Sequence, residues 1–123
     1  MAKPYSFDLD EENGTFFVKA KGFFQVEDAK MYLSEFQTIV NTINPSSYKL
    51  IVDGRGQEEV AGHVVDDIEF VLKLYWMANF KKIIIINPSS PASRMQVENC
   101  VKKINFPGIF VDSIEEANSL ISP

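Results

Sequence analysis

The chain has 123 residues and a formal charge of −5, from 12 Lys and Arg against 17 Asp and Glu. A chain of this length is expected to form one domain over residues 1–123, and its acidic balance opposes binding to nucleic-acid backbones or anionic membrane surfaces. Its single cysteine and single histidine exclude an internal disulfide and a His/Cys zinc set, so we expect no metal and no other cofactor.

The chain also lacks the sequence features of a membrane or exported protein. No apolar run approaches the roughly 20 residues that a membrane span needs, and the first nine residues carry no apolar signal segment. We therefore expect a cytoplasmic protein without stable membrane insertion.

Two strands joined by a tight turn open the chain. Apolar and polar residues alternate over 4–10 and again over 14–20, which is the period of a strand with one buried face. Asn13 and Gly14 stand between these runs, and this pair favours a type I′ turn because both central positions need a positive φ. The sequence therefore predicts an antiparallel hairpin.

Helices and buried strands alternate along the rest of the chain. Apolar stripes at helical spacing predict helices, and short β-branched runs with few polar residues are typical of strands buried on both faces. Ser90, followed by a proline, is expected to cap a helix. The predicted elements are a helix at 25–43, a strand at 48–53, a helix at 64–80, a strand at 83–86, a helix at 90–104, a strand at 109–111 and a helix from 113.

The predicted order of elements is β-β-α-β-α-β-α-β-α. Strands joined by a single helix lie parallel, whereas the opening hairpin is antiparallel. The fold class is therefore α/β, with a mixed sheet of four to five strands covered by about four helices.

This order and three local segments resemble the STAS domain of sulphate transporters and anti-sigma factor antagonists. Residues 14–22 resemble that family's second strand with its closing glycine, 50–53 its central strand with its closing aspartate, and 109–117 its closing strand and helix. The likeness spans nearly the whole chain. It implies a STAS-like fold and a bacterial, regulatory module that binds a partner and is not an enzyme.

The resemblance also implies a phosphorylation for which this chain has no acceptor at the usual place. In anti-sigma factor antagonists, a partner kinase phosphorylates a serine or threonine at the start of the helix after the central strand. The corresponding place here is 61–63, and no serine or threonine occurs between Ser47 and Ser89. Ser89 and Ser90 remain as candidate acceptors outside that place.

The segment after the central strand is the first candidate site. Asp53 and Arg55 are expected in a glycine-rich loop at the carboxyl end of a parallel strand, where α/β sheets place ligand crevices. The Arg55 guanidinium suits a carboxylate or a phosphate, but the glycine spacing is not a nucleotide fingerprint, and a surface turn is the simpler interpretation.

His63, Asp66 and Asp67 follow on the next helix. The two carboxylates lie one helical turn after the imidazole and can orient it as a base. No nucleophile is near in the sequence, so the acids are better explained as stabilising the helix start. As a further hypothesis, they replace the missing phosphate charge in partner binding.

The helix over 64–80 is the second candidate site. One of its apolar stripes is expected to face the core, and Phe70, Leu74 and Met77 form a second stripe at i, i+4 and i+7, with Trp76 nearby. A chain this small has little room to bury both stripes, so we expect the second to cover a protein partner or a second copy of the chain.

These residues predict a non-enzymatic, regulatory protein-interaction module that binds a partner or itself, as a dimer, through the 53–63 loop and the 64–80 helix. The alternative is a small-ligand or lipid-binding module, as in the related CRAL-TRIO domains. A hydrolase or transferase ranks third, because no catalytic set is complete.

Overall fold

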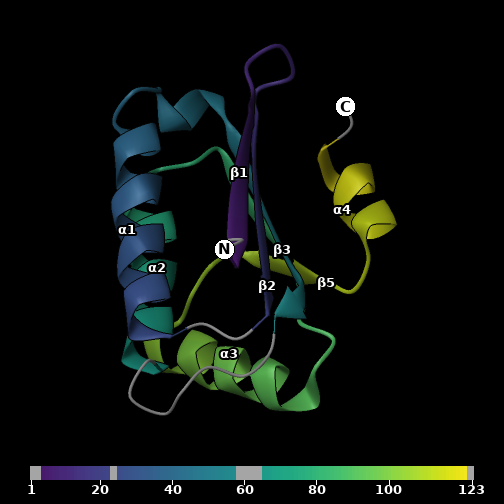
Figure 1. The fold of residues 1–123 in the computed structure, drawn as a ribbon. Helices are drawn as coiled ribbons and strands as arrows, with labels where there is room; N and C mark the ends of the chain where they lie inside the picture. The colour runs from purple at the N-terminus through teal and green to yellow at the C-terminus, as the bar shows by residue number, and fades with distance from the viewer. Residues whose placement is uncertain (1–3, 23–24, 58–64, 122–123) are drawn as a thin grey trace.

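The computed structural model describes residues 4–22, 25–57 and 65–121, which form a five-stranded sheet in the order β1-β2-β3-β4-β5 with helices on both faces (Figure 1). Its elements are β1 (Tyr5–Asp10), β2 (Thr15–Gly22), α1 (Val26–Val40), a short 3₁₀ helix (Pro45–Ser47), β3 (Lys49–Gln57), α2 (Val65–Met77), β4 (Lys82–Ile86), α3 (Pro91–Ile104), β5 (Ile109–Val111) and α4 (Ile114–Ile121).

The sheet is mixed, as predicted. β1 pairs antiparallel with β2, whereas each later pair, β2 with β3, β3 with β4 and β4 with β5, is parallel. The predicted order of strands and helices is confirmed. The first two helices are shorter than predicted, since α1 ends at Val40 and α2 at Met77. Ser90 caps α3 as expected, because its side chain accepts a hydrogen bond from the Ser93 backbone N–H.

The hairpin turn differs from the predicted type I′ turn. The last paired residues are Asp10 and Thr15, so four residues, 11–14, form the loop. Gly14 has a φ of +63°, but Asn13 does not have a positive φ. Instead, the Asp10 carboxylate accepts hydrogen bonds from the backbone N–H and the side-chain amide of Asn13, at 3.1 and 2.8 Å. This side-chain contact favours a longer turn than the Asn-Gly pair alone predicts.

Strand β3 continues where the sequence predicted a loop. It runs past Asp53 to Gln57, because β2 shifts its register between Lys19 and Lys21 and then pairs with the added residues. Gly56 makes this pairing possible, since a Cβ at that position would lie 2.9 Å from the Cβ of Lys21. The glycine thus serves a close approach of two strands and not a turn.

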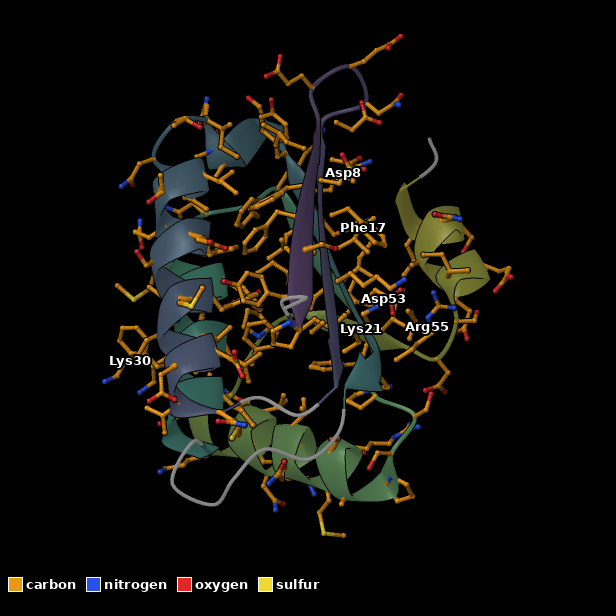
Figure 2. All side chains as sticks on the ribbon, viewed as in Figure 1. Asp8, Phe17, Lys21, Lys30, Asp53 and Arg55 are labelled. Carbon is orange, nitrogen blue, oxygen red and sulfur yellow. The ribbon has the colours of Figure 1, made fainter. Side chains whose placement is uncertain are left out.

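The helices are distributed unequally over the two faces of the sheet. Helices α1, α2 and α3 pack against the face that carries Leu50 and Val52, whereas α4 packs against the face that carries Ile51 (Figure 1). On the α4 side, the side chains of Phe17 and Asp53 lie near that helix (Figure 2). Consecutive β3 residues therefore alternate between the two layers.

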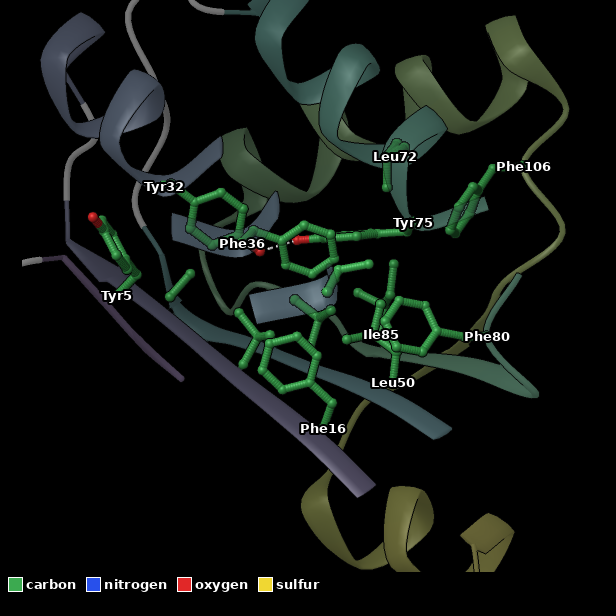
Figure 3. Packing of buried hydrophobic residues seen from close by; sticks show 14 of the residues in the cluster. Tyr5, Phe16, Tyr32, Phe36, Leu50, Leu72, Tyr75, Phe80, Ile85 and Phe106 are labelled. Atoms are coloured by element: carbon green, nitrogen blue, oxygen red, sulfur yellow. Dashed lines mark hydrogen bonds between the residues drawn. The ribbon is translucent and has the colours of Figure 1, made fainter. Parts of the chain in front are cut away.

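An aromatic cluster joins the three-helix layer to the sheet (Figure 3). The Phe36 ring on α1 stacks on Phe16 of β2 at a centroid distance of 5.7 Å and meets the edge of Tyr75 on α2 at 5.1 Å. Phe80, just after α2, lies within 6.3 Å of both phenylalanine rings. The hydroxyls of Tyr32 and Tyr75 are hydrogen-bonded to each other inside this cluster, and burial raises the pKa of both groups. The cluster fixes which side of α2 faces the core.

No helix within 4–22, 25–57 and 65–121 is long and apolar enough to cross a bilayer.

Replacing Phe36 with alanine tests the cluster. Phe36 is almost completely buried among the rings, so Phe36→Ala is expected to lower the free energy of unfolding by about 3–5 kcal/mol through lost burial and a residual cavity. Phe70→Ala is the matched control, and because Phe70 is largely exposed it should cost less than about 1 kcal/mol. Urea denaturation followed by circular dichroism measures both, and equal costs would contradict the role of the cluster.

Candidate partner-binding site

Strand β3 places Asp53 and Arg55 on the face of the sheet that carries α4 (Figure 2). Only 3 % of Asp53 is exposed. Its Oδ1 accepts hydrogen bonds from the backbone N–H and the Nε of Arg55 at 3.1 and 2.9 Å, and its Oδ2 accepts one from Nη2 at 2.8 Å. The carboxylate is therefore occupied by its neighbour two residues along the strand.

This pairing fixes the charge state of both groups. The hydrogen bonds from Arg55 lower the pKa of Asp53 despite its burial, and Lys19, which pairs with Asp53 across the β2–β3 ladder, lowers it further. Asp53 in turn raises the pKa of Arg55. Asp53 is therefore ionised and holds the Arg55 guanidinium in place. The Arg55 side chain remains 43 % exposed.

The carboxyl ends of β3, β4 and β5 are tied together next to this pair. The backbone N–H of Ser89 donates to the carbonyl oxygen of Arg55 at 3.1 Å. Asp112, after β5, accepts a hydrogen bond from the Asn87 amide at 3.0 Å and pairs with Arg94 of α3 at 3.2 Å. These groups satisfy one another's hydrogen-bonding capacity, so the segments that follow β3, β4 and β5 are held together at this edge of the sheet.

The outer face of α2 presents the second apolar stripe. Phe70 is 52 % exposed and Met77 is 74 % exposed, while Leu74 between them is partly buried. Leu72 and Tyr75 on the opposite side of the same helix are buried in the core. The helix is therefore apolar on two sides, and only one of them is covered within the described chain.

A shallow hollow between α2 and α3 adjoins this stripe and is lined by Glu69, Phe70, Lys73 and Lys103. The Glu69 carboxylate pairs with the Nζ of Lys73 at 3.2 Å and with the Nζ of Lys103 at 3.1 Å. Hydrogen bonds from Lys103 and Lys73 lower the pKa of Glu69. Two ammonium groups thus share one carboxylate beside an exposed aromatic ring.

The structure separates the residues that the sequence grouped as one partner surface. Asp53 and Arg55 lie on the α4 side of the sheet, whereas Phe70, Leu74 and Met77 lie on the outer side of the opposite helical layer. His63 falls outside the described residues, and so do the side chains of Asp66 and Asp67.

Sequence reasoning missed the hollow between α2 and α3. Glu69 and Lys73 have the i, i+4 spacing of a helical ion pair, which was a detectable signal. Lys103 comes from a different helix, and no local pattern predicts that it reaches Glu69.

Within the described residues, no three His, Cys, Asp or Glu side chains converge as metal ligands would.

Comparison with known proteins identifies the fold. The chain superposes on the crystal structure of an anti-sigma factor antagonist from Mycobacterium paratuberculosis with a TM-score of 0.67 and 12 % identity, over 98 % of this chain and 97 % of the other. It also superposes on an uncharacterised protein with a SpoIIAA-like fold from Shewanella loihica, with a TM-score of 0.65 and 17 % identity, over 96 % and 92 %. No family model and no curated sequence matches the chain. The fold is STAS-like, as the sequence resemblance implied.

Replacing Asp53 with asparagine tests the ion pair. Because the folded-state pKa of Asp53 is lowered, its stabilisation is complete above the ordinary value of 3.8 and is lost as the pH falls through the folded value. Asp53→Asn is expected to cost about 1–3 kcal/mol at pH 7, and the difference from the wild type should shrink below about pH 4. Urea denaturation at pH 7 and pH 3 measures this difference.

Asp112→Asn is the matched control, because Asp112 is exposed and surface pairs contribute only about 0–1 kcal/mol. A difference for Asp53→Asn that stays constant between pH 7 and pH 3 would contradict the proposed role of the charge.

Proposed function

We propose that this chain is a non-enzymatic, regulatory protein-interaction module of the bacterial cytoplasm. It binds a protein partner, or a second copy of itself, through the outer face of α2, with Phe70, Leu74 and Met77 at the centre of the contact. The 53–63 segment, with Arg55 and His63, is proposed as a second contact; Arg55 lies on the α4 side of the sheet, apart from the α2 stripe.

The exposure of the α2 stripe carries this proposal. Phe70 and Met77 leave most of their apolar surface in contact with water although the helix has a complete core-facing side. Contiguous apolar surface of this kind is characteristic of protein interfaces, whose centres are depleted of charge and enriched in aromatic residues and methionine. The STAS-like fold supports the same role, because one of the structural neighbours is described as an anti-sigma factor antagonist.

The described residues give less support to the alternatives. A lipid or small-ligand module needs an enclosed apolar crevice, and the hollow beside Phe70 is not one, because it is open and is lined by three charged side chains. An acyl- or phosphoryl-transfer enzyme needs a nucleophile aligned with a base. Asp53 and Arg55 instead bond each other.

Asp66 and Asp67 contribute to partner binding through their negative charge. In a chain without a serine or threonine between Ser47 and Ser89, these carboxylates supply a permanent negative charge near the start of α2. They take the place of a phosphate in partner binding. Unchanged partner capture by an Asp66→Ala, Asp67→Ala variant would contradict this part of the proposal.

Charge placed in the α2 stripe tests the interface. Phe70→Glu and Met77→Glu should each weaken partner capture or self-association at least tenfold, because a carboxylate buried in an apolar contact loses its hydration without a compensating partner. Both residues are exposed, so the variants should keep the wild-type circular dichroism spectrum.

The measurement combines size-exclusion chromatography with affinity capture from cells of the source organism, followed by reconstitution with the purified captured protein. Met95→Glu is the matched control, since Met95 is an exposed methionine on α3. Wild-type elution and wild-type binding by both α2 variants would refute the interface, and a small molecule retained in native mass spectrometry would favour the ligand-binding alternative.

A further inference from the structure

We propose that the outer edge of β1 binds a basic, extended segment of a protein partner as an added antiparallel strand of the sheet. This inference goes beyond the proposed function, because it uses a different surface and does not depend on the α2 stripe. The sheet has two edge strands, and β5 at the other edge has only three residues, whereas β1 has six. β1 is therefore the edge that is long enough to pair with another strand.

The hydrogen bonds of the hairpin show which backbone groups of β1 face outward. The Lys21 N–H donates to the carbonyl oxygen of Pro4 at 2.8 Å, in an antiparallel register that continues along the strand. Hydrogen-bonded and non-hydrogen-bonded pairs alternate in such a ladder, so the even-numbered residues of β1 bond to β2 and the odd-numbered ones point away from it. The N–H and C=O groups of Phe7 and Leu9 therefore face the open edge, and no group in the described part of the chain bonds to them.

The helices leave this edge accessible. They lie beside the two faces of the sheet, and none of them passes in front of β1 (Figure 1). The side chains of Phe7 and Leu9 point to the three-helix layer, where Phe7 contacts the rings of Phe16 and Tyr32 at centroid distances of 5.8 and 5.4 Å. Both side chains are nevertheless only partly buried. Apolar side chains of an added strand would cover what remains exposed of them.

The opposite face of β1 carries an acidic side chain. Asp8 pairs with Phe17 in the ladder, so its carboxylate lies on the α4 side of the sheet (Figure 2). The Asp8 side chain is exposed, and none of the ion pairs among the described residues includes it. Lys19 lies diagonally across from it, and the charge of this lysine lowers the pKa of Asp53. Asp8 can therefore pair with a cation on an added strand.

Charge also decides between a basic partner and a second copy of the chain. Three further acids, Asp10, Glu11 and Glu12, follow Asp8, and no lysine or arginine occurs between Lys3 and Lys19. Two-fold pairing of β1 with its own copy would bring both sets of acids to one sheet and would join two chains of charge −5. A strand that carries lysine or arginine meets the same edge with attraction. The acids thus oppose self-pairing and favour a basic partner.

The two faces of β1 together predict the sequence pattern of the partner. In an antiparallel pair, each partner residue opposite Phe7 or Leu9 exchanges backbone hydrogen bonds with it and directs its side chain to the three-helix layer. The residues between them direct their side chains to the face of Asp8. A segment of alternating apolar and basic residues, about as long as β1, therefore matches this edge.

The probe is a pair of synthetic peptides with blocked ends, in which valine alternates with lysine or, in the second peptide, with glutamate. We expect the lysine peptide to bind at least tenfold more tightly by calorimetry. Bound peptide should also slow the hydrogen exchange of the Phe7 and Leu9 N–H groups at least tenfold, as measured by nuclear magnetic resonance. The Asp8 N–H is the internal control, because it bonds to β2 in the free protein and should change little.

Backbone methylation of the lysine peptide tests strand pairing apart from charge. The valine N–H groups face β1 in an antiparallel pair, so N-methylation of the valines should abolish binding. N-methylation of the lysines keeps the same charge and blocks only outward-facing groups, so it should change the dissociation constant by no more than about twofold. Equal losses from the two modifications would overturn the proposal.

Charge reversal on the protein provides the last arm. Asp8→Lys should weaken the lysine peptide at least tenfold and should strengthen the glutamate peptide, and the exposed position should leave the fold unchanged. Glu98→Lys makes the same change of total charge on α3, where the Glu98 side chain is 55 % exposed. This control should change neither dissociation constant by more than about twofold, and equal effects of the two variants would overturn the role of Asp8.

The remaining outcomes separate this inference from the proposed function. Equal binding of the two peptides would overturn the basic strand, and so would loss of the lysine peptide in Phe70→Glu, since the peptide would then lie on the α2 stripe. Protection of the Phe7 and Leu9 N–H groups that rises with protein concentration, without peptide, would identify a second copy as the occupant and would also overturn the inference. If Phe70→Glu still abolishes partner capture in these cases, the α2 interface stands.

Discussion

The contact of Phe36 with Phe16, Tyr75 and Phe80 determines how the rest of the molecule is arranged. It holds α1 and α2 against the same strands and fixes the rotation of α2 about its own axis. Because Tyr75 must point inward, the residues on the other side of the helix, Phe70 among them, must point outward. The exposed stripe is therefore a consequence of the core, and a rotation of α2 that hid the stripe would break the aromatic cluster.

The unequal covering of the sheet separates two kinds of chemistry. Three helices bury one face, and α4 covers part of the other, where the Lys82 ammonium donates to the carbonyl of Leu120 at 3.1 Å. On this second face Asp53 and Arg55 form an ion pair within β3. The pair stabilises the carboxyl end of that strand. The exposed apolar side chains Phe70 and Met77 lie on the outer side of the opposite layer, on α2. The ion pair and the exposed apolar stripe thus lie on different sides of one sheet.

The sequence was sufficient for the features that depend on local periodicity. The strand and helix order follows from apolar spacing, and the Ser90 cap follows from residue types at adjacent positions. The extension of β3 could not be predicted, because it depends on a register shift in β2 and on the closeness of Gly56 to Lys21. The local sequence pattern predicts a loop at Gly56, whereas in the structure this glycine allows β2 and β3 to approach each other closely.

The exposed stripe by itself is too small to hold a stable complex. Burying what remains exposed of Phe70 and Met77 would contribute about 2–4 kcal/mol, since full burial of such a side chain is worth about 1.5–3 kcal/mol. Association costs an estimated 4–15 kcal/mol in lost freedom, so further contacts have to supply the difference. A contact of this size therefore favours a reversible complex over a permanent one.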